Sequence, residues 1–243
     1  MSQLTESVRL EREGDVALVV VDNPPVNALS HHVRQGILDG VTQATDSDAK
    51  AIVIICDGRT FIAGADITEF GSAPKGPSLQ AVQDAMENSP KPVVAAIHGT
   101  ALGGGLEVAL CAHFRVADAG AKFGLPEVKL GLLPEPVARS GSPVTGVEKA
   151  LDMMTSGDQI GTDEALDCGL IDEIADDLRA GAVAFANKVA NEGATLTRSA
   201  TVTTSWPPPR PTRRSSPTFA RRSPARPAVS SLRNTTSSAS KRQ

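Results

Sequence analysis

The chain has 243 residues, of which 40% are hydrophobic and 3% are aromatic, and its formal net charge is −4. This composition suits one sizeable globular core, while the lack of tyrosine and the single tryptophan leave few rings to stack on bases or sugars. No uncharged apolar run approaches the roughly 18 residues of a membrane-spanning helix. We therefore expect neither a membrane span nor a cleaved signal peptide.

Short apolar runs alternate with helical patterns along the first 192 residues. Four runs have the composition and length of strands: Val16–Val21, Ala51–Cys56, Val93–Ile97 and Phe114–Ala117. Helical spacing predicts helices over Ser30–Thr45, Ser78–Asn88, Leu151–Ser156, Asp163–Cys168 and Leu178–Ala190. The first of these helices has Ser30 as a suitable N-cap. Buried strands that alternate with helices predict a layered α/β fold.

Two glycine-containing segments, Thr60–Ile67 and His98–Glu107, each follow a predicted strand. In the second segment, Gly103–Gly105 opens a stretch of good helix formers. Glycines at a helix start leave backbone N–H groups unpaired at the positive end of the helix dipole, which suits an anion or a developing oxyanion. The alternative is that these glycines serve turns and close packing. No G-x-G-x-x-G pattern is present, so a dinucleotide fingerprint is not indicated.

Two glutamates accompany the second glycine segment. Glu107 follows Gly104 by three residues, and helical spacing places its carboxylate on the same face as the Gly104 N–H group. Glu127 follows twenty residues later, within Lys122–Gly131. Taken singly, each glutamate is most often a solvated surface charge. Two carboxylates that converge on an oxyanion site would instead supply general acid–base chemistry.

Together these segments resemble the enoyl-CoA hydratase/isomerase (crotonase) superfamily over roughly residues 8–175. The matching motifs are Asn23–Ser30, Phe61–Ile67, Ala101–Glu107 and Phe123–Gly131, which occur in the family's order and spacing. Gly64–Phe70 and Val147–Met154 look most like the hydratase half of bifunctional fatty-acid oxidation enzymes. In those enzymes a 3-hydroxyacyl-CoA dehydrogenase follows on the same chain, and we expect no such domain within this sequence.

The resemblance implies a fold and a set of site residues. The fold would be a crotonase-like α/β spiral of ββα units. The backbone N–H groups of Ala65 and Gly104 would form an oxyanion hole for the thioester carbonyl. Glu107 and Glu127 would hold and activate water, and Glu127 would exchange the proton at the α-carbon. The residues implied to line the acyl-CoA site are Val26, Ala28, Ala63, Asp66, Ile67 and Thr68. Asp66 is as well suited to cap the helix that follows it.

The implied reaction is hydration of a trans-2-enoyl-CoA to a 3-hydroxyacyl-CoA in fatty-acid β-oxidation. Its substrate would be an acyl-CoA thioester, and no cofactor would be needed beyond the CoA that the substrate carries. A Δ3–Δ2-enoyl-CoA isomerase shares the same apparatus and is one alternative. A catalytically impaired acyl-CoA-binding remnant is the other. Family members also form trimers, so a homo-oligomer is expected if the C-terminal end permits it.

The cysteines and histidines bear on metal binding and compartment. Cys56, Cys111 and Cys168 lie in apolar runs and indicate neither a disulfide framework nor a metal cluster. The four histidines lack the spacing of metal ligands; they are His31, His32, His98 and His113. We therefore expect no metal site, a reducing compartment and a cytoplasmic location.

The chain departs from the family after Leu132-Leu133-Pro134. Members typically continue Gly-Ala-Gly-Gly-Thr-Gln-Arg-Leu-Pro, whereas this chain has Glu135–Pro143. Codons can be written for the family version that give all nine residues of Glu135–Pro143 when they are read one base later. We therefore hypothesise a local frame shift, with the frame restored near Gly146.

Residues 193–243 differ in charge from the rest of the chain. They hold ten basic residues and no acidic one, whereas residues 1–192 hold all 28 acidic residues and 14 basic ones. A Ser/Thr/Pro/Arg-rich composition is typical of disorder or of arms that bind nucleic acid or membranes. A shifted reading frame can also produce Arg222–Ser240, so we expect no nucleic-acid partner, with a non-specific phosphate-binding arm as the alternative.

Two regions follow from these patterns. Residues 1–192 are expected to form the crotonase-like domain, incomplete at its C-terminal end. Residues 193–243 are expected to form a basic, disordered tail whose sequence comes from a shifted reading frame. Prolines prevent this tail from forming the amphipathic helix with which family members close the acyl pocket.

Overall fold

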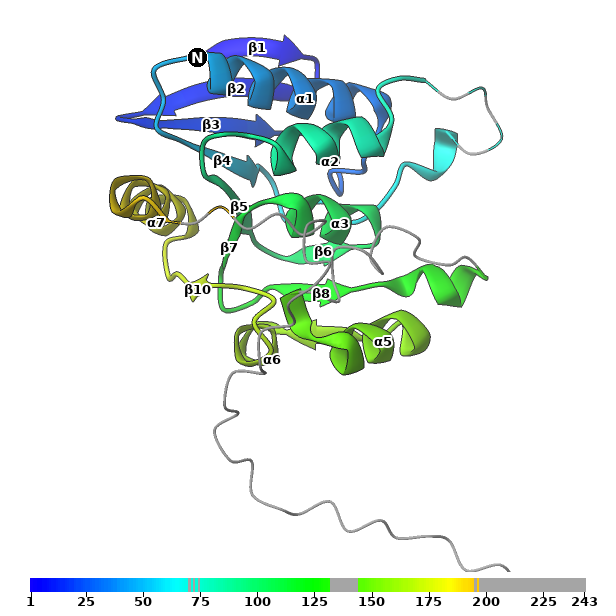
Figure 1. Cartoon of the computed structure of the whole chain (residues 1–243). Helices are drawn as coiled ribbons and strands as arrows, with labels where there is room; N and C mark the ends of the chain where they lie inside the picture. The colour runs from blue at the N-terminus through cyan, green and yellow to red at the C-terminus, as the bar shows by residue number, and fades with distance from the viewer. Residues whose placement is uncertain (70, 72, 74, 132–143, 195, 197–243) are drawn as a thin grey trace, which may run out of the picture. The chain divides into compact units, whose positions relative to one another are not determined.

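The computed structural model describes residues 1–69, 71, 73, 75–131, 144–194 and 196 (Figure 1). Within this part of the chain, seven strands form the larger sheet in the order β1-β2-β3-β4-β5-β7-β10. These strands are β1 (Ser2–Thr5), β2 (Val8–Glu13), β3 (Val16–Val21), β4 (Ala51–Cys56), β5 (Val93–Ile97), β7 (Phe114–Ala117) and β10 (Glu173–Ile174). The pairs β1–β2 and β2–β3 are antiparallel, and the remaining neighbours are parallel.

A smaller sheet stands beside the end of the large one. It contains β6 (Thr100–Leu102), β8 (Lys122–Gly124) and β9 (Gln159–Gly161), with β6 parallel to β8 and β8 antiparallel to β9. β6 follows β5 after two residues, so the chain passes directly from the large sheet into the small one. The segment between β5 and β6 therefore lies where the two sheets meet.

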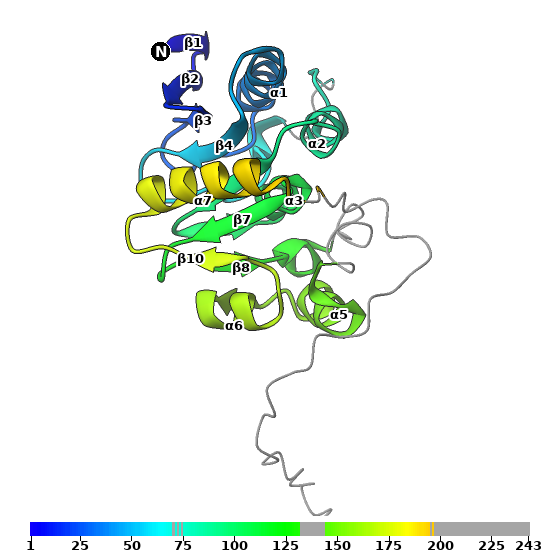
Figure 2. The same cartoon turned by 60° about the vertical axis from the view of Figure 1, so that its left-hand side comes forward.

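Helices cover both faces of the large sheet. The α-helices are α1 (His31–Asp46), α2 (Leu79–Glu87), α3 (Gly104–Cys111), α5 (Val147–Ser156), α6 (Thr162–Asp167) and α7 (Leu178–Glu192), and the 3₁₀ helices are η1 (Ile67–Glu69) and η2 (Pro126–Leu130). Figure 2 shows α7 on one face of the sheet and α1, α2 and α3 toward the other. This arrangement confirms the predicted layered α/β fold.

The central strands explain why the sheet is covered on both faces. Every residue of β3 and β4 is buried, so these strands have apolar side chains on both sides. Val19 and Ile54 belong to the core beneath α1, α2 and α3. Val20 and Ile55, one residue further along, belong to the core beneath α7. The uninterrupted apolar runs of the sequence thus correspond to strands between two helical layers.

The sequence predictions and the structure agree on most elements. The four predicted strands have the predicted bounds. Ser30 and Ser78 cap α1 and α2, accepting hydrogen bonds from the N–H groups of Val33 at 3.4 Å and Ala81 at 3.2 Å. The structure extends α7 to Glu192 and begins α5 at Val147, before the predicted Leu151. The short strands β1, β2, β6, β8, β9 and β10 were not predicted, because most offer too few residues for a pattern.

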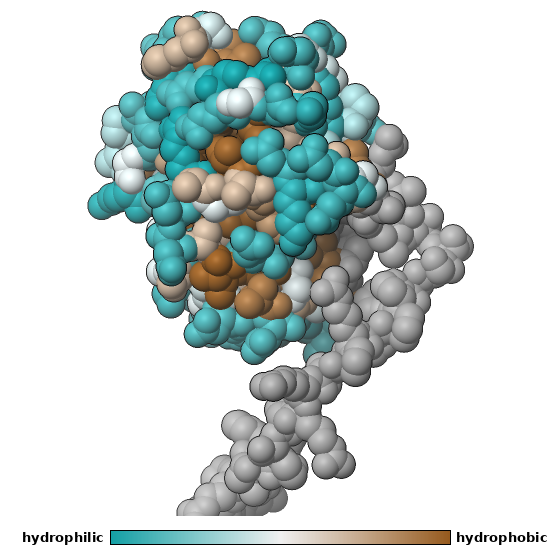
Figure 3. Space-filling view, turned by 90° about the vertical axis from the view of Figure 1, so that its left-hand side faces the viewer, coloured by the Kyte–Doolittle hydropathy of each residue, from teal (hydrophilic) through white to brown (hydrophobic). Residues whose placement is uncertain are grey.

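The surface of the described residues carries both polar and apolar regions. The face in Figure 3 is mostly hydrophilic, with apolar side chains showing in patches between the polar ones. Val147 and Leu151 on α5 and Leu166 on α6 are among the exposed large apolar residues. No helix of this part of the chain is both long and apolar enough to cross a membrane. Glu135–Pro143 and nearly all of residues 193–243 lie outside the described residues.

Helix α1 approaches the sheet through two glycines. A methyl group at Gly36 would lie 2.3 Å from Cβ of Val8, and one at Gly40 would lie 2.8 Å from a methyl carbon of Val19. Both valines are buried, and neither Cβ nor the branched methyls can rotate out of the way. The glycines therefore set the distance between α1 and the antiparallel part of the sheet.

This close approach predicts that Gly36→Ala destabilises the fold. Glycine to alanine inside a helix normally stabilises by about 1 kcal/mol. Here the clash with Val8 reverses the sign, and the free energy of unfolding in urea falls by about 1–3 kcal/mol. Gly120→Ala is the control, because its methyl group would meet only an Asp118 oxygen at 3.6 Å. Equal stability of Gly36→Ala and the wild type would contradict the packing described for α1.

Candidate active site

The two glycine-containing segments meet at the ends of parallel neighbouring strands. β4 and β5 pair in parallel, so the residues that follow them emerge at the same edge of the sheet. The N–H group of Thr100 donates to the Thr60 hydroxyl at 2.7 Å, and the N–H group of Phe61 donates to the His98 carbonyl at 2.8 Å. The Leu102 N–H group donates to the Ile62 carbonyl at 3.2 Å. These bonds hold the two segments against each other.

The peptide bond between Gly64 and Ala65 fixes the direction of the Ala65 N–H group. The Gly64 carbonyl, which belongs to the same peptide plane, accepts a hydrogen bond from the Leu29 N–H group at 2.9 Å. In a trans peptide the N–H bond points opposite to the carbonyl. The Ala65 N–H group therefore points away from Leu29, and it donates to no acceptor among the described residues. Ala65 is also solvent-exposed, so this donor is available to a ligand.

The Gly104 N–H group lies beside that of Ala65. Gly104 is the first residue of α3, where a helix leaves its N–H groups without internal acceptors. Its predecessor Gly103 has φ of +51°, a conformation that favours glycine, and its carbonyl accepts the Glu107 N–H group at 3.0 Å. A methyl group on Gly104 would stand 3.9 Å from the Ala65 nitrogen. The start of α3 therefore lies next to the Ala65 nitrogen, and two open backbone donors in one place are what an oxyanion hole requires.

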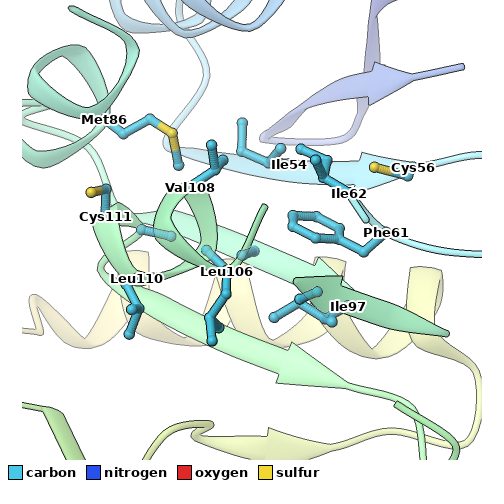
Figure 4. Close-up of a cluster of buried hydrophobic side chains, with 14 of the residues drawn as sticks. Ile54, Cys56, Phe61, Ile62, Met86, Ile97, Leu106, Val108, Leu110 and Cys111 are labelled. Carbon is cyan, nitrogen blue, oxygen red and sulfur yellow. The ribbon is translucent and has the colours of Figure 1, made fainter. Parts of the chain in front are cut away.

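Helix α3 is held in place by very close packing of its first turn. A methyl group on Gly105 would lie 1.9 Å from the Ile62 carbonyl oxygen, so only glycine fits there. Further along the helix, Leu106, Val108 and Leu110 are fully buried in the core between α2 and the sheet (Figure 4). The rigid core beneath α3 fixes the position of its open N-terminus.

The two glutamates converge on the same place. Glu107 lies in the first turn of α3 and is only 6% exposed. Glu127 lies in the first turn of η2, and its Oε1 atom would stand 2.5 Å from a methyl group on Gly103. Its other oxygen, Oε2, is buried and has no hydrogen-bond partner in the described part of the chain. The glycines thus leave room for a carboxylate directly beside the open N-terminus of α3.

Burial raises the pKa of both carboxyl groups. For Glu107, burial and the negative charge of Glu127 raise the pKa from 4.5 to about 7, although the Gln83 side chain lowers it in part. For Glu127, burial also raises the pKa, against a backbone hydrogen bond that lowers it. Near neutral pH the pair can therefore both hold and release a proton, as acid–base chemistry requires.

A pocket of about 730 Å³ adjoins the Ala65 side of the site. Of the residues predicted to line the substrate site, Asp66 and Thr68 line this pocket, together with the predicted oxyanion-hole residue Ala65. Val26, Ala28, Ala63 and Ile67 are not part of that described wall. Asp66 caps η1, accepting hydrogen bonds from the backbone N–H of Thr68 at 2.9 Å and from its hydroxyl at 2.7 Å. Asp66 therefore caps η1, and its contact with the substrate stays a prediction.

Arg34 ties the segment after Ala65 to helix α1. Its guanidinium donates to the carbonyls of Pro77 and Leu29 at 2.8 Å and to the Glu69 carboxylate at 3.0 Å. Glu69 also accepts the His31 N–H group at 2.7 Å, so it caps the first turn of α1. Burial acts to raise the pKa of Glu69, but the bonds from His31 and Arg34 hold it below its ordinary value.

Sequence reasoning predicted the two donors and the two glutamates, which the structure brings together, but it did not predict the side chains that support them. No recognisable sequence motif contains Arg34, Glu69 or Gln83. Each of these side chains acts through a contact between elements that are distant in the chain. The sequence also predicts no metal site, from the spacing of its histidines and cysteines. Among the residues that the structure describes, no group of three or more histidine, cysteine, aspartate or glutamate side chains is placed to hold a metal ion.

The chain matches the family model of enoyl-CoA hydratase/isomerase over residues 11–206. It therefore belongs to the enoyl-CoA hydratase/isomerase family. The human peroxisomal bifunctional enzyme is 47% identical over 182 residues, which are 73% of this chain and 25% of that protein. A probable enoyl-CoA hydratase of Bacillus subtilis is 40% identical over 192 residues, which are 71% of this chain and 73% of that one. The chain thus spans about a quarter of the length of the bifunctional relatives.

Solved structures of similar fold agree with the family assignment. An enoyl-CoA hydratase from Thermoplasma volcanium superposes with a TM-score of 0.69 at 30% identity, over 76% of this chain and 77% of that one. DspI from Pseudomonas aeruginosa gives a TM-score of 0.71 at 28% identity, over 77% of this chain and 81% of that one. The predicted crotonase-like fold is confirmed.

The raised pKa of Glu107 predicts how stability depends on pH. The folded state binds this proton more tightly than the unfolded state, so stability is lost as the pH rises from about 4.5 to about 7. Glu107→Gln removes this loss. We expect its free energy of unfolding at pH 8 to exceed that of the wild type by up to about 3 kcal/mol, with little difference at pH 4. Chemical denaturation at both pH values measures this, and a gain of equal size at pH 4 would contradict the electrostatic cause.

Proposed function

We propose that the chain hydrates trans-2-enoyl-CoA thioesters to 3-hydroxyacyl-CoA in fatty-acid β-oxidation. The observation that carries the proposal is the convergence of two open backbone donors, Ala65 and Gly104, with the carboxylates of the buried Glu107 and the half-buried Glu127. Donors of this kind stabilise negative charge on a thioester oxygen, and carboxylates beside them can move protons. The names of the relatives, which include enoyl-CoA hydratases and bifunctional β-oxidation enzymes, support the same reaction.

In the proposed mechanism the thioester carbonyl accepts hydrogen bonds from Ala65 and Gly104. Glu107 and Glu127 hold a water molecule above the double bond. The water oxygen bonds to C3 while one of its O–H bonds breaks and that proton passes to the Glu107 carboxylate. The electrons of the C2=C3 double bond move toward the thioester, and the negative charge develops on the carbonyl oxygen. Glu127 then delivers a proton to C2 as the carbonyl reforms. The proton that Glu107 took from water replaces the one that Glu127 gave to C2, so the water supplies both the hydroxyl group and the net proton and no further reactant is needed.

The electrostatics of the pair suit these roles. Two ionised carboxylates in a buried site repel each other, so adding one proton to the pair is favourable up to near-neutral pH. One carboxyl group can then carry the proton for C2 while the other accepts a hydrogen bond from water. The positive end of the α3 dipole stabilises the charge that develops on the thioester oxygen.

The acyl-CoA substrate is proposed to occupy the region around Ala63–Thr68 and the turn at Val26–Ala28. The pocket beside Ala65 supplies part of that volume. No cofactor is proposed beyond the CoA of the substrate, and neither nucleic acid nor metal is proposed as a partner. The exposed apolar residues Val147 and Leu151 of α5 support self-association, which we propose as a trimer-type homo-oligomer.

A cytoplasmic location is proposed because Cys56, Cys111 and Cys168 form no disulfide bond within the described residues. Several relatives are named peroxisomal or glyoxysomal, so an organelle is the alternative compartment. The division at residue 192 and the frame-shift origin of Glu135–Pro143 and of residues 193–243 remain proposals. Resequencing the gene across codons 134–146 and 190–200 tests them, and reading frames that match those of close relatives would refute the frame shift.

Three activities are separated by two assays. With crotonyl-CoA as the substrate, a hydratase lowers the ultraviolet absorbance, because hydration removes the conjugated enoyl thioester. An isomerase instead creates that absorbance from a 3-enoyl-CoA without consuming water. A remnant would bind acyl-CoA in calorimetry and change neither absorbance. Loss of the crotonyl-CoA signal is the result expected for this chain.

The role of Glu127 gives a direct prediction. Glu127→Gln keeps the size and hydrogen-bonding capacity of the side chain but removes the transferable proton. We expect kcat for crotonyl-CoA hydration to fall by about 10²–10⁴-fold. Circular dichroism and the affinity for acyl-CoA should remain at wild-type levels. Turnover within a few-fold of the wild type would refute the assigned role.

The backbone donor of Gly104 can be removed without breaking the helix. Proline is favoured at the first residue of a helix, so Gly104→Pro deletes the N–H group where α3 tolerates the ring. We expect kcat to fall by about 10²–10³-fold. Gly104→Ala is the matched control, since it keeps the donor and its methyl group would meet neighbours only at 3.6 Å or more. Equal losses in both variants would show that bulk, and not the missing donor, is responsible.

A further inference from the structure

Gln83 of α2 is a buried polar side chain that the proposed mechanism does not use. The residue is 4% exposed. Its amide nitrogen Nε2 is buried and has no hydrogen-bond partner within the described residues. A buried amide without a full set of partners costs stability, and such groups are uncommon in native structures. A buried donor left open beside a catalytic group calls for a functional explanation.

The register between α2 and α3 places this amide opposite Glu107. Cδ2 of Leu79 would stand 3.7 Å from a methyl group on Gly104, so the first turns of the two helices face each other. Gln83 lies one turn beyond Leu79, and Glu107 lies one turn beyond Gly104. One turn beyond Gln83, Met86 points toward Val108, the residue that follows Glu107, in the shared core (Figure 4).

We infer that Gln83 is a positioning residue for Glu107: its open amide N–H group is the donor that orients the Glu107 carboxylate and holds it in the ionised form when the site takes up its water. This inference rests on the proposed hydratase function for its catalytic meaning. An ionised Glu107 can accept a hydrogen bond from the attacking water, whereas a protonated one cannot do so with the same oxygen. Gln83 therefore sets the pH above which the site can hold water in the reactive orientation.

The balance of effects on Glu107 agrees with this role. Among the described residues, those that shift its pKa are Glu127 from η2 and Gln83 from α2. Burial and the Glu127 charge raise the pKa, and the Gln83 side chain is the influence that lowers it. Without the amide, the proton would stay on Glu107 to a higher pH.

The test replaces the amide with an apolar side chain of similar size. Gln83→Met and, as a second variant, Gln83→Leu remove the donor while still filling the space. Both are expected to fold, because an unsatisfied buried amide is exchanged for an apolar group. Gln80→Met is the matched control, since Gln80 lies on the same helix but is exposed.

The first readout does not depend on activity. Protein labelled with ¹³C at the glutamate side-chain carboxyl is titrated by NMR, and the Glu107 signal is identified by its loss in Glu107→Gln. We expect the titration midpoint of Glu107 to rise by about one pH unit in both Gln83 variants, a tenfold change in proton affinity. The midpoint in Gln80→Met should equal that of the wild type. An unchanged midpoint in the folded Gln83 variants would overturn the inference.

The second readout is the pH profile of crotonyl-CoA hydration. The acidic limb of kcat should move to higher pH by the same amount, with KM changed less than about twofold and kcat recovering at alkaline pH. A loss of kcat that is equal at every pH would indicate a merely structural role and would also overturn the inference. If the midpoint moves but neither the wild type nor any variant hydrates crotonyl-CoA, Gln83 keeps its assignment and the proposed function fails.

Discussion

The first turn of α3 lies against the backbone of Ile62 at a distance that no side chain would permit. Glycine at position 105 allows this approach, and the neighbouring glycines place two further groups. Gly104 brings its N–H group beside that of Ala65, and Gly103 leaves the space that the Glu127 carboxylate occupies. One close contact between a helix and a loop thus positions both donors and one of the two carboxylates. The three consecutive glycines act as a unit, each making room for a different group.

The same contact places charge where the solvent is excluded, and the electrostatics follow from that. Glu107 is buried because it sits in the turn that packs most tightly, and burial raises its pKa to about 7. A carboxyl group in this state makes the folded protein less stable at neutral pH, yet it gives the site a group that exchanges protons there. The instability and the acid–base capacity therefore have a single origin. The hydrophobic core around β4, β5 and α3 offsets this loss of stability.

The sequence was sufficient for those parts of the fold that local patterns specify. The central strands have uninterrupted apolar runs, and Ser30 and Ser78 mark the starts of α1 and α2, so these elements were predicted closely. β6 and β8 have only three residues each, and pairing with distant segments creates them. At the site, Gly104, Glu107 and Glu127 could be inferred from motif and spacing. Arg34 and Gln83 could not, because neither belongs to a motif and each reaches its partner only after folding.

The two ends of α3 differ in a way that explains why the site lies at its N-terminus. At the C-terminal end the buried Arg115 guanidinium donates to the Ala112 carbonyl at 2.7 Å and also to the Leu170 carbonyl at 2.6 Å. The carbonyl groups that a helix leaves open at this end are thus supplied with a charged donor. At the other end the Gly104 N–H group has no acceptor among the described residues. The carbonyl groups at the C-terminal end of this short helix thus have a donor, whereas the N–H group of its first residue lacks an acceptor in the described part of the chain. The unsatisfied end of the helix is therefore its N-terminus. That end faces the substrate oxygen in the proposed reaction, so the dipole of α3 acts where charge develops.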